Sequence, residues 1–332
     1  MKTAPKTITR IIEEIRQHRS FCVIGHQRPD GDCIGSQLAL TFALKNEGYK
    51  VACWNQDPIP QKLRFLDTEN TIQKPKPNQA FDCVIAVDSA SLDRVGDVAS
   101  FVEDRKVLIN IDHHASNTRY GDINWVSPNE PSSGELVYRL LKTARWSIKQ
   151  GIADCLFTAI STDTGSFQYP TSRPSTYAIA GDLVEKGANL AVICDEVYQS
   201  YPLSRVKLLK HVYNHFKLTN DNEIAYFWLR PADYQRSGAT RDETEGLIDH
   251  IRDIDPVIVA CLFEEIETEV VRISLRSKSS FVNVNDIAKQ FDGGGHKAAA
   301  GALITGKSMT IQRRVVKAIR EALKAGKAAG LK

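Results

Sequence analysis

The chain has 332 residues, enough for two domains that each bury a core, and its hydrophobic and charged contents of 42% and 25% are typical of globular proteins. Its formal net charge of +3 is too small to mark a nucleic-acid-binding protein by overall charge alone.

The sequence has no clear signal peptide, no membrane-spanning stretch and no paired-cysteine motif. Residues 1–10 contain no apolar signal core, and the longest apolar stretch, 257–263, is too short to span a bilayer. The seven cysteines are scattered without a C-x-x-C pair, which indicates reduced, buried thiols rather than structural zinc. We therefore expect a cytoplasmic protein that does not act at a membrane.

The first half alternates helix-like and strand-like segments. Apolar residues recur at helical spacing in 8–18, 34–47, 132–142, 152–161 and 175–186. Short apolar runs predict strands at 20–25, 50–54, 81–87 and 106–111. This alternation predicts an α/β fold whose N-terminal sheet is mainly parallel and flanked by helices.

The character of the chain changes in the second half. A helical pattern over 189–216 is interrupted around Tyr201-Pro202. Strand patterns then occupy 223–229, 257–264 and 269–276, and helical patterns occupy 242–251, 285–291 and 311–324. We predict a first domain over residues 1–188, a helical linker over 189–217 and a smaller C-terminal α/β domain over 218–332.

Acidic and histidine residues gather near the ends of the predicted strands and of the helix 152–161. Since the carboxyl ends of parallel strands meet at one edge of a sheet, we expect these side chains to converge. The candidate ligands are His26, Asp30, Asp32, Asp88, His113 and Asp163. Oxygen and imidazole ligands suit a pair of Mn²⁺-like ions, which catalyse phosphoryl transfer.

Each cluster has a plainer interpretation when taken singly. An Asp after a strand is usually a turn former or a helix cap, and a His-His pair is more often solvated or packed in a core. Convergence favours the metal site, because unpaired carboxylates held together would repel one another strongly.

The second half contains a candidate anion-binding segment. Gly293-Gly294-Gly295-His296 precedes an alanine-rich stretch that we expect to be helical, and glycine backbone at a helix N-terminus can hold an anion. Arg276 can donate two hydrogen bonds to a phosphate or a base edge. The alternative is that the glycines form a flexible turn.

These motifs resemble a known superfamily. Asp112-His113-His114 resembles the signature of the DHH phosphoesterases, and the other clusters resemble its companion motifs in the same order. The segment 293–301 is similar to the glycine-histidine motif of the DHH-associated domain. The segment 274–278 resembles its counterpart in the branch of nanoRNases and pAp phosphatases, and the resemblance covers nearly the whole chain.

The resemblance implies a set of roles around two divalent ions, most often Mn²⁺. One ion would be held by His26, Asp30 and Asp88, and the other by Asp32, Asp88, His113 and Asp163. His114 would face the scissile phosphate and Asp112 would fix the imidazoles, so Asp88, Asp112 and His114 are the expected catalytic residues. The expected substrate-binding residues are Arg276, Ser277, Gly294, Gly295 and His296.

The implied activity is hydrolysis of short oligoribonucleotides to mononucleotides and of 3′-phosphoadenosine 5′-phosphate (pAp) to AMP and phosphate. Long duplex nucleic acid is not an expected partner, and homodimers are common among such proteins. Two alternatives stay open: a phosphodiesterase for cyclic or linear dinucleotides such as pApA or pGpG, and a nucleotide- or RNA-binding protein without catalysis.

Overall fold

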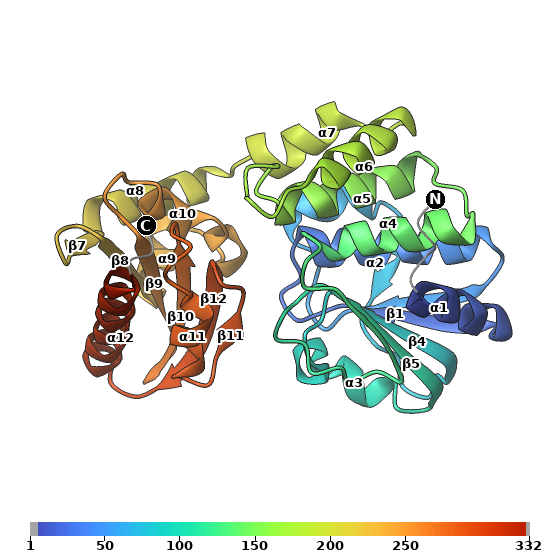
Figure 1. The fold of residues 1–332 in the computed structure, drawn as a ribbon, viewed down its shortest axis with the longest axis horizontal. Coiled ribbons are helices and arrows are strands. Elements are labelled where there is room, and N and C mark those ends of the chain that lie inside the picture. The colour runs from blue at the N-terminus through green and yellow to red at the C-terminus, as the bar shows by residue number, and fades with distance from the viewer. Residues whose placement is uncertain (1–5, 330–332) are drawn as a thin grey trace. The chain divides into compact units, whose positions relative to one another are not determined.

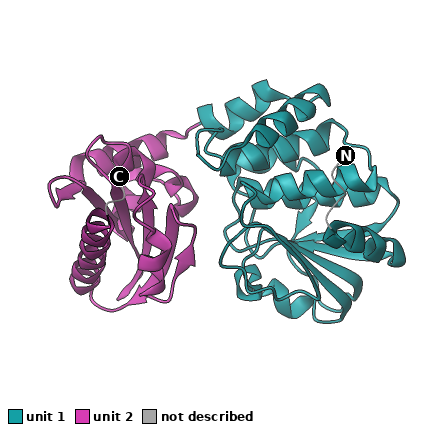
Figure 2. Cartoon of the chain, in the orientation of Figure 1, with its two compact units in different colours: residues 1–200 teal, residues 201–332 magenta. Residues whose placement is uncertain are grey.

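The computed structural model describes residues 6–329, and the chain divides into two compact units, residues 1–200 and 201–332 (Figure 2). The division lies inside the segment that we expected to link two domains. The helix α7 (Leu190–Cys194) belongs to the first unit, and α8 (Leu203–His215) belongs to the second. In residues 6–329, each helix is too short or too polar to cross a membrane.

The first unit is built on a parallel sheet. In sheet order its strands are β3 (Ile72–Gln73), β2 (Lys50–Trp54), β1 (Ser20–Ile24), β4 (Phe81–Val87), β5 (Arg105–Asp112) and β6 (Ile123–Val126). Each neighbouring pair is parallel, as predicted. The strand order reverses between β1 and β4, and a reversal of this kind opens a crevice at the carboxyl ends of the two strands.

Helices cover both faces of this sheet (Figure 1). They are α1 (Lys6–Gln17), α2 (Gly31–Asn46), α3 (Val98–Phe101) and α4 (Ser133–Ala144). A further layer packs on α2 and α4: α5 (Gln150–Asp163) contacts both of them, and α6 (Pro174–Glu185) and α7 contact α5. The main core lies on the face that carries α1, α2, α4 and α5, and a smaller core lies under α3. The predicted elements of this unit are confirmed, although α2 begins earlier than its apolar pattern because Asp30 caps it.

Two of these helices are in backbone contact. A Cβ atom on Gly35 of α2 would lie 2.3 Å from the carbonyl oxygen of Cys155 and 2.9 Å from Cβ of Ala159, both on α5. Nearer the strand ends, a Cβ on Gly31 would lie 2.4 Å from Oγ1 of Thr162. Glycine at these positions therefore lets the start of α2 and the end of α5 approach closely.

The second unit has a mixed sheet. In sheet order its strands are β11 (Gly294–Gly295), β12 (Ala299–Thr305), β10 (Val270–Ser277), β9 (Val259–Glu267), β8 (Ile224–Leu229) and β7 (Lys217–Thr219). Its helices are α8, α9 (Pro231–Ser237), α10 (Leu247–Arg252), α11 (Val284–Lys289) and α12 (Ser308–Ala328). The helices α11 and α12 enclose one core with the sheet, and α8 and α10 enclose another.

The alanine-rich stretch after Gly295 is a strand, so our expectation of a helix there is wrong. β12 pairs antiparallel with β10 along its length, and Ala300 and Ala302 are buried. A Cβ on Gly301 would lie 2.8 Å from the carbonyl oxygen of Ile273, so a small residue is needed there. Pairing with β10 overrides the intrinsic helix preference of alanine, and no helix N-terminus follows the glycines.

Candidate metal centre

Asp88 is the central residue of the cluster. It follows β4 directly, is 2% exposed, and has a φ of 53°, a left-handed conformation that is uncommon for residues other than glycine. Its Oδ2 lies 3.4 Å from Nε2 of His26, and its Oδ1 lies 3.5 Å from Nε2 of His113. The two oxygens of one carboxylate thus face two different imidazoles.

His26 stands just past the end of β1 and is buried. Its Nδ1 lies 2.7 Å from the carbonyl oxygen of Gln27, so this nitrogen donates and Nε2 faces the carboxylates. Oδ1 of Asp30 lies 3.8 Å from Nε2 and also accepts the backbone N–H of Cys33 at 3.0 Å. The cap of α2 therefore positions one of the expected ligands.

His113 forms the second half of the cluster. Its Nε2 lies 3.2 Å from Oδ2 of Asp163, at the end of α5, and 3.7 Å from Oδ2 of Asp32. Its Nδ1 lies 3.3 Å from the carbonyl oxygen of Glu130, which orients the ring with Nε2 toward the carboxylates. All six expected ligands therefore converge, as the sequence predicted for the ends of β1, β4, β5 and α5.

The N-terminus of α4 supplies donors that we did not identify from the sequence. The backbone N–H groups of Ser133 and Gly134 donate to Oδ2 and Oδ1 of Asp32 at 2.6 and 2.8 Å. The hydroxyl of Ser133 donates to Oδ1 of Asp88 at 3.0 Å. Unpaired N–H groups of a first helical turn stabilise a carboxylate, so this helix end fixes two expected ligands.

Two residues of the same helix form an ion trio with Glu130. Nη2 of Arg139 lies 3.3 Å from Oε2 of Glu130 and 3.2 Å from Oε2 of Glu135. Glu135 is fully buried in the first turn of α4. The residue whose carbonyl orients His113 is therefore tied through its side chain to α4.

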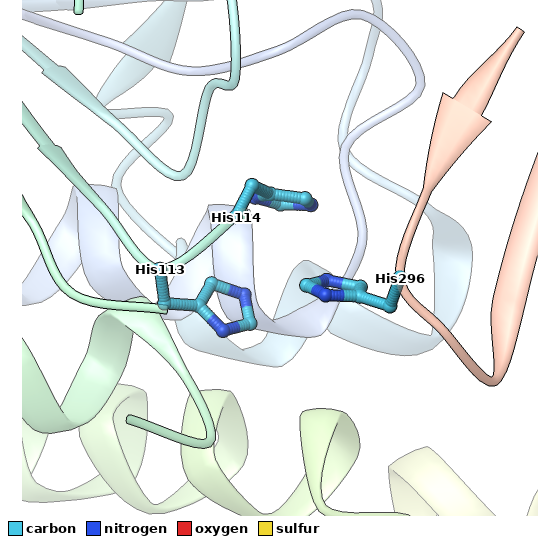
Figure 3. A group of neighbouring side chains, drawn as sticks. All are labelled: His113, His114 and His296. Carbon is cyan, nitrogen blue, oxygen red and sulfur yellow. The ribbon is translucent and has the colours of Figure 1, made fainter. Parts of the chain in front are cut away.

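Asp112 and His114 form a hydrogen-bonded pair beside the cluster. Nδ1 of His114 donates to Oδ1 of Asp112 across 2.8 Å, and Asn117 donates to Oδ2 of the same buried carboxylate at 2.6 Å. Burial lowers the pKa of His114, but the bond to Asp112 and the charge of Asp88 outweigh it, so the pKa is raised. The rings of His113 and His114 meet edge-on, with centroids 4.8 Å apart (Figure 3).

The crowded carboxylates make the cluster a strong acceptor of positive charge. Burial raises the pKa of Asp163 to about 7; the His113 imidazole opposes this shift, and the Asp30 carboxylate adds to it. Burial and the Asp88 carboxylate also raise the pKa of Asp32 well above its usual range. Divalent ions would replace the protons that these groups otherwise share, and the oxygen and imidazole donors fit such ions.

The expected substrate-binding residues lie together at one end of the second unit's sheet. Arg276 and Ser277 end β10, Gly294 and Gly295 form β11, and His296 follows (drawn in Figure 3). Arg276 is paired in register with Ala299 of β12, and Gly295 is paired with the next residue of that strand. Gly295 has a φ of 147°, and a Cβ there would lie 2.5 Å from the carbonyl oxygen of Ala299.

Known proteins resemble both units. The model of the DHH family N-terminal domain matches residues 20–160, and the DHHA1 domain model matches residues 221–326. The "Bifunctional oligoribonuclease and PAP phosphatase NrnA" of Thermus thermophilus is 33% identical, over 90% of this chain and 88% of the relative. The Bacillus subtilis protein of the same name is 27% identical, over 89% and 93% of the two chains.

A solved structure extends this likeness to the fold. The exopolyphosphatase-related protein of Bacteroides fragilis superposes with a TM-score of 0.87 at 27% identity, and the match covers 99% of each chain. The matches to both family models, together with relatives that align along nearly their whole length, agree with the converging cluster at the end of the parallel sheet. The chain therefore belongs to the DHH family, and its second unit is a DHHA1 domain.

Proposed function

We propose that this protein is a metal-dependent phosphoesterase that hydrolyses short oligoribonucleotides to mononucleotides and pAp to AMP and phosphate. The full-length relatives named as bifunctional oligoribonuclease and PAP phosphatase support this substrate pair. The seven cysteines are all unpaired, which is consistent with a reducing compartment such as the cytoplasm.

The observation that carries the proposal is the position of Asp88 between two imidazoles. A carboxylate with one oxygen toward each imidazole suits a bridge between two ions. We assign His26, Asp30 and Asp88 to one Mn²⁺. The other Mn²⁺ is assigned to Asp32, Asp88, His113 and Asp163.

Two bound ions would lower the pKa of an attacking water and neutralise charge on the phosphate oxygens. The chain contributes orientation around them. The bond from Nδ1 of His114 to Asp112 orients the ring, and Nε2 of His114 is the nitrogen proposed to face the substrate. His114 then donates a hydrogen bond to the phosphate or its leaving oxygen.

The second unit is proposed to hold the part of the substrate that does not react. Arg276 is suited to a second phosphate or a base edge, and His296 is proposed to add a hydrogen-bond donor. The hydroxyl of Ser277 donates to the carbonyl oxygen of Ser279 at 3.0 Å, and it would have to exchange that bond to donate to a substrate. The backbone of Gly294 is proposed to let an anion approach closely, because only Oδ1 of Asn285, at 3.9 Å, lies within 4 Å of the place that a Cβ would take. Gly295 instead allows β11 to lie against β12. A short substrate with two phosphates satisfies such a site without a long basic groove.

The experiment uses the full-length protein with Mn²⁺ and separate substrates: 5′-labelled di- to decaribonucleotides, pAp, pApA and cyclic di-AMP. We expect Mn²⁺-dependent release of mononucleotides from the shortest RNAs and of phosphate from pAp, abolished by a chelator. Turnover of cyclic di-AMP in preference to both substrates would replace this proposal with a cyclic-dinucleotide phosphodiesterase. Binding of nucleotides without any product would contradict the enzymatic role.

A further inference from the structure

A sulfur atom lies within the cluster around His26. Sγ of Cys33, a ring nitrogen of His26 and a carboxylate oxygen of Asp88 all lie within 4.8 Å of one another, and all three residues are buried. This spacing is compatible with three ligands that share one ion. None of the ligands that we predicted from the sequence was a cysteine.

The backbone holds Cys33 in this position. Its N–H donates to Oδ1 of Asp30 at 3.0 Å, so the cap that places Asp30 also places the first turn of α2. A Cβ atom on Gly25 would lie 2.5 Å from Sγ of Cys33. Glycine before His26 therefore leaves the volume that the sulfur fills, and the thiol is directed toward the imidazole rather than packed in an apolar core.

The other cysteines differ in their surroundings. Within residues 6–329, the groups of neighbouring metal-ligand side chains include no cysteine besides Cys33. Cys83 and Cys155, for example, are buried in the main apolar core of the first unit. The contrast indicates that the contact of Cys33 with His26 and Asp88 is specific to this position.

We propose that Cys33 is a sulfur ligand for the ion at His26 and that it shifts the preference of this position from Mn²⁺ toward borderline ions such as Zn²⁺ and Co²⁺. The inference rests on the proposed dinuclear centre. On binding, the thiol releases its proton to solvent and the sulfur–metal bond forms with no change in oxidation state. Thiolate binds Zn²⁺ and Co²⁺ more strongly than the harder Mn²⁺, so one sulfur ligand is enough to alter selectivity.

The experiment titrates Co²⁺ into the full-length protein and records the near-ultraviolet absorption of a bond between thiolate sulfur and Co²⁺. We expect this band in the wild type and in the control Cys194→Ser, and its loss in Cys33→Ser and Cys33→Ala. Competition between Zn²⁺ and Mn²⁺ gives a second readout. Without Cys33, the ratio of the Zn²⁺ affinity to the Mn²⁺ affinity should fall by roughly 10-fold or more. Loss of a residue that only orients a metal ligand can already have an effect of this size.

Several outcomes would overturn the inference. A Co²⁺-loaded wild type without the band, or a Cys33→Ala protein that keeps it, would exclude sulfur ligation while leaving the metal centre in place. Absence of both Co²⁺ and Mn²⁺ binding in the wild type would instead remove the proposed centre and this inference with it. Cys33→Ser nearly keeps the side-chain volume, and unchanged thermal unfolding of that variant separates ligand loss from misfolding.

Discussion

The hydroxyl of Ser133 donates to Oδ1 of Asp88 across 3.0 Å, although 45 residues separate the two in the chain. The same helix end donates two backbone N–H groups to Asp32. The first turn of α4 is therefore a fixed support for two carboxylates that are proposed to share one ion. Support of this kind keeps ligand oxygens in place when the ions leave.

Ser133→Ala tests the hydroxyl separately from the backbone donors. We expect Mn²⁺ affinity to fall by about 10- to 100-fold, because partners that orient metal ligands have effects of this size. Ser132→Ala is the matched control, since Ser132 caps the N–H of Glu135 at 3.2 Å without contacting Asp88. The control should lose about 0.5–2 kcal/mol of stability and keep its metal affinity. Equal Mn²⁺ affinities in the two variants, by isothermal titration, would contradict the assigned support.

Asp88→Asn tests the bridge between the ions. Asparagine tolerates the left-handed backbone at this position and preserves the side-chain size, but it removes the negative charge that is proposed to hold both ions. We expect turnover of both pAp and short RNA to be abolished and Mn²⁺ stoichiometry to fall. Asp221→Asn changes an exposed aspartate with a similar φ of 54° and should have no effect on either measurement. Near-normal rates in Asp88→Asn would exclude a bridging role.

Arg139→Met tests whether the ion trio orients His113. Methionine removes the charge that ties Glu130 to the buried Glu135. We expect the affinity for one of the two Mn²⁺ ions to fall by about 10- to 100-fold, because the carbonyl of Glu130 loses its support. Lys142 lies on the same helix as Arg139 and pairs with Asp182 of α6, so Lys142→Met removes an ion pair away from the site and should leave both affinities unchanged. Electron paramagnetic resonance of bound Mn²⁺ distinguishes the two sites.

Gly35→Ala tests the close contact between α2 and α5. The added Cβ would lie 2.3 Å from a backbone oxygen, so the helices must separate, and we expect a loss of about 1–3 kcal/mol in the free energy of unfolding. Gly181 lies inside α6 with nothing within 4 Å of the built Cβ. Gly181→Ala should therefore raise stability by roughly 0.5–1 kcal/mol. Urea unfolding measures both, and stabilisation by Gly35→Ala would show that the helices move apart without cost.

Gly295→Ala tests the glycine backbone of the second unit. We expect KM for pAp to rise while Mn²⁺ binding stays unchanged, because the added Cβ meets β12 and displaces β11. Gly306 has a comparable φ of 139° with open space around it, so Gly306→Ala carries the same conformational cost without the contact. If both variants raise KM equally, backbone strain rather than the shape of the anion site is responsible.

The sequence predicted the parts of the fold that depend on local pattern. Continuous apolar runs predict β4 and β5. Because parallel strands end at a common edge of the sheet, these two strands also predict that Asp88 and His113 lie close together. The stretch from Ala299 to Thr305 was misinterpreted because alanine favours helix, whereas its pairing with β10 is a contact between distant segments. The local amino-acid composition does not indicate which distant strand this segment will pair with.

The missed residues of the site share one property: their role depends on which atoms they contact. The pattern of residues 132–135 is typical of a helix start and indicates a capping residue. It does not indicate that the N–H groups of the first turn donate to the carboxylate of Asp32. Asn117 follows the two histidines closely, yet nothing in its spacing indicates a bond to Asp112. Cys33 sits among the ligand motifs, but a cysteine without a C-x-x-C partner indicates only a reduced, buried thiol.

The left-handed backbone of Asp88 has a consequence for laboratory evolution. Glycine adopts this conformation at no steric cost, whereas an aspartate pays for it with strain that the surrounding structure must absorb. Selection for thermal stability alone should therefore enrich glycine at position 88 and yield variants that are more stable but catalytically inactive. Library screens that score only expression or melting temperature would discard the residue on which turnover is proposed to depend.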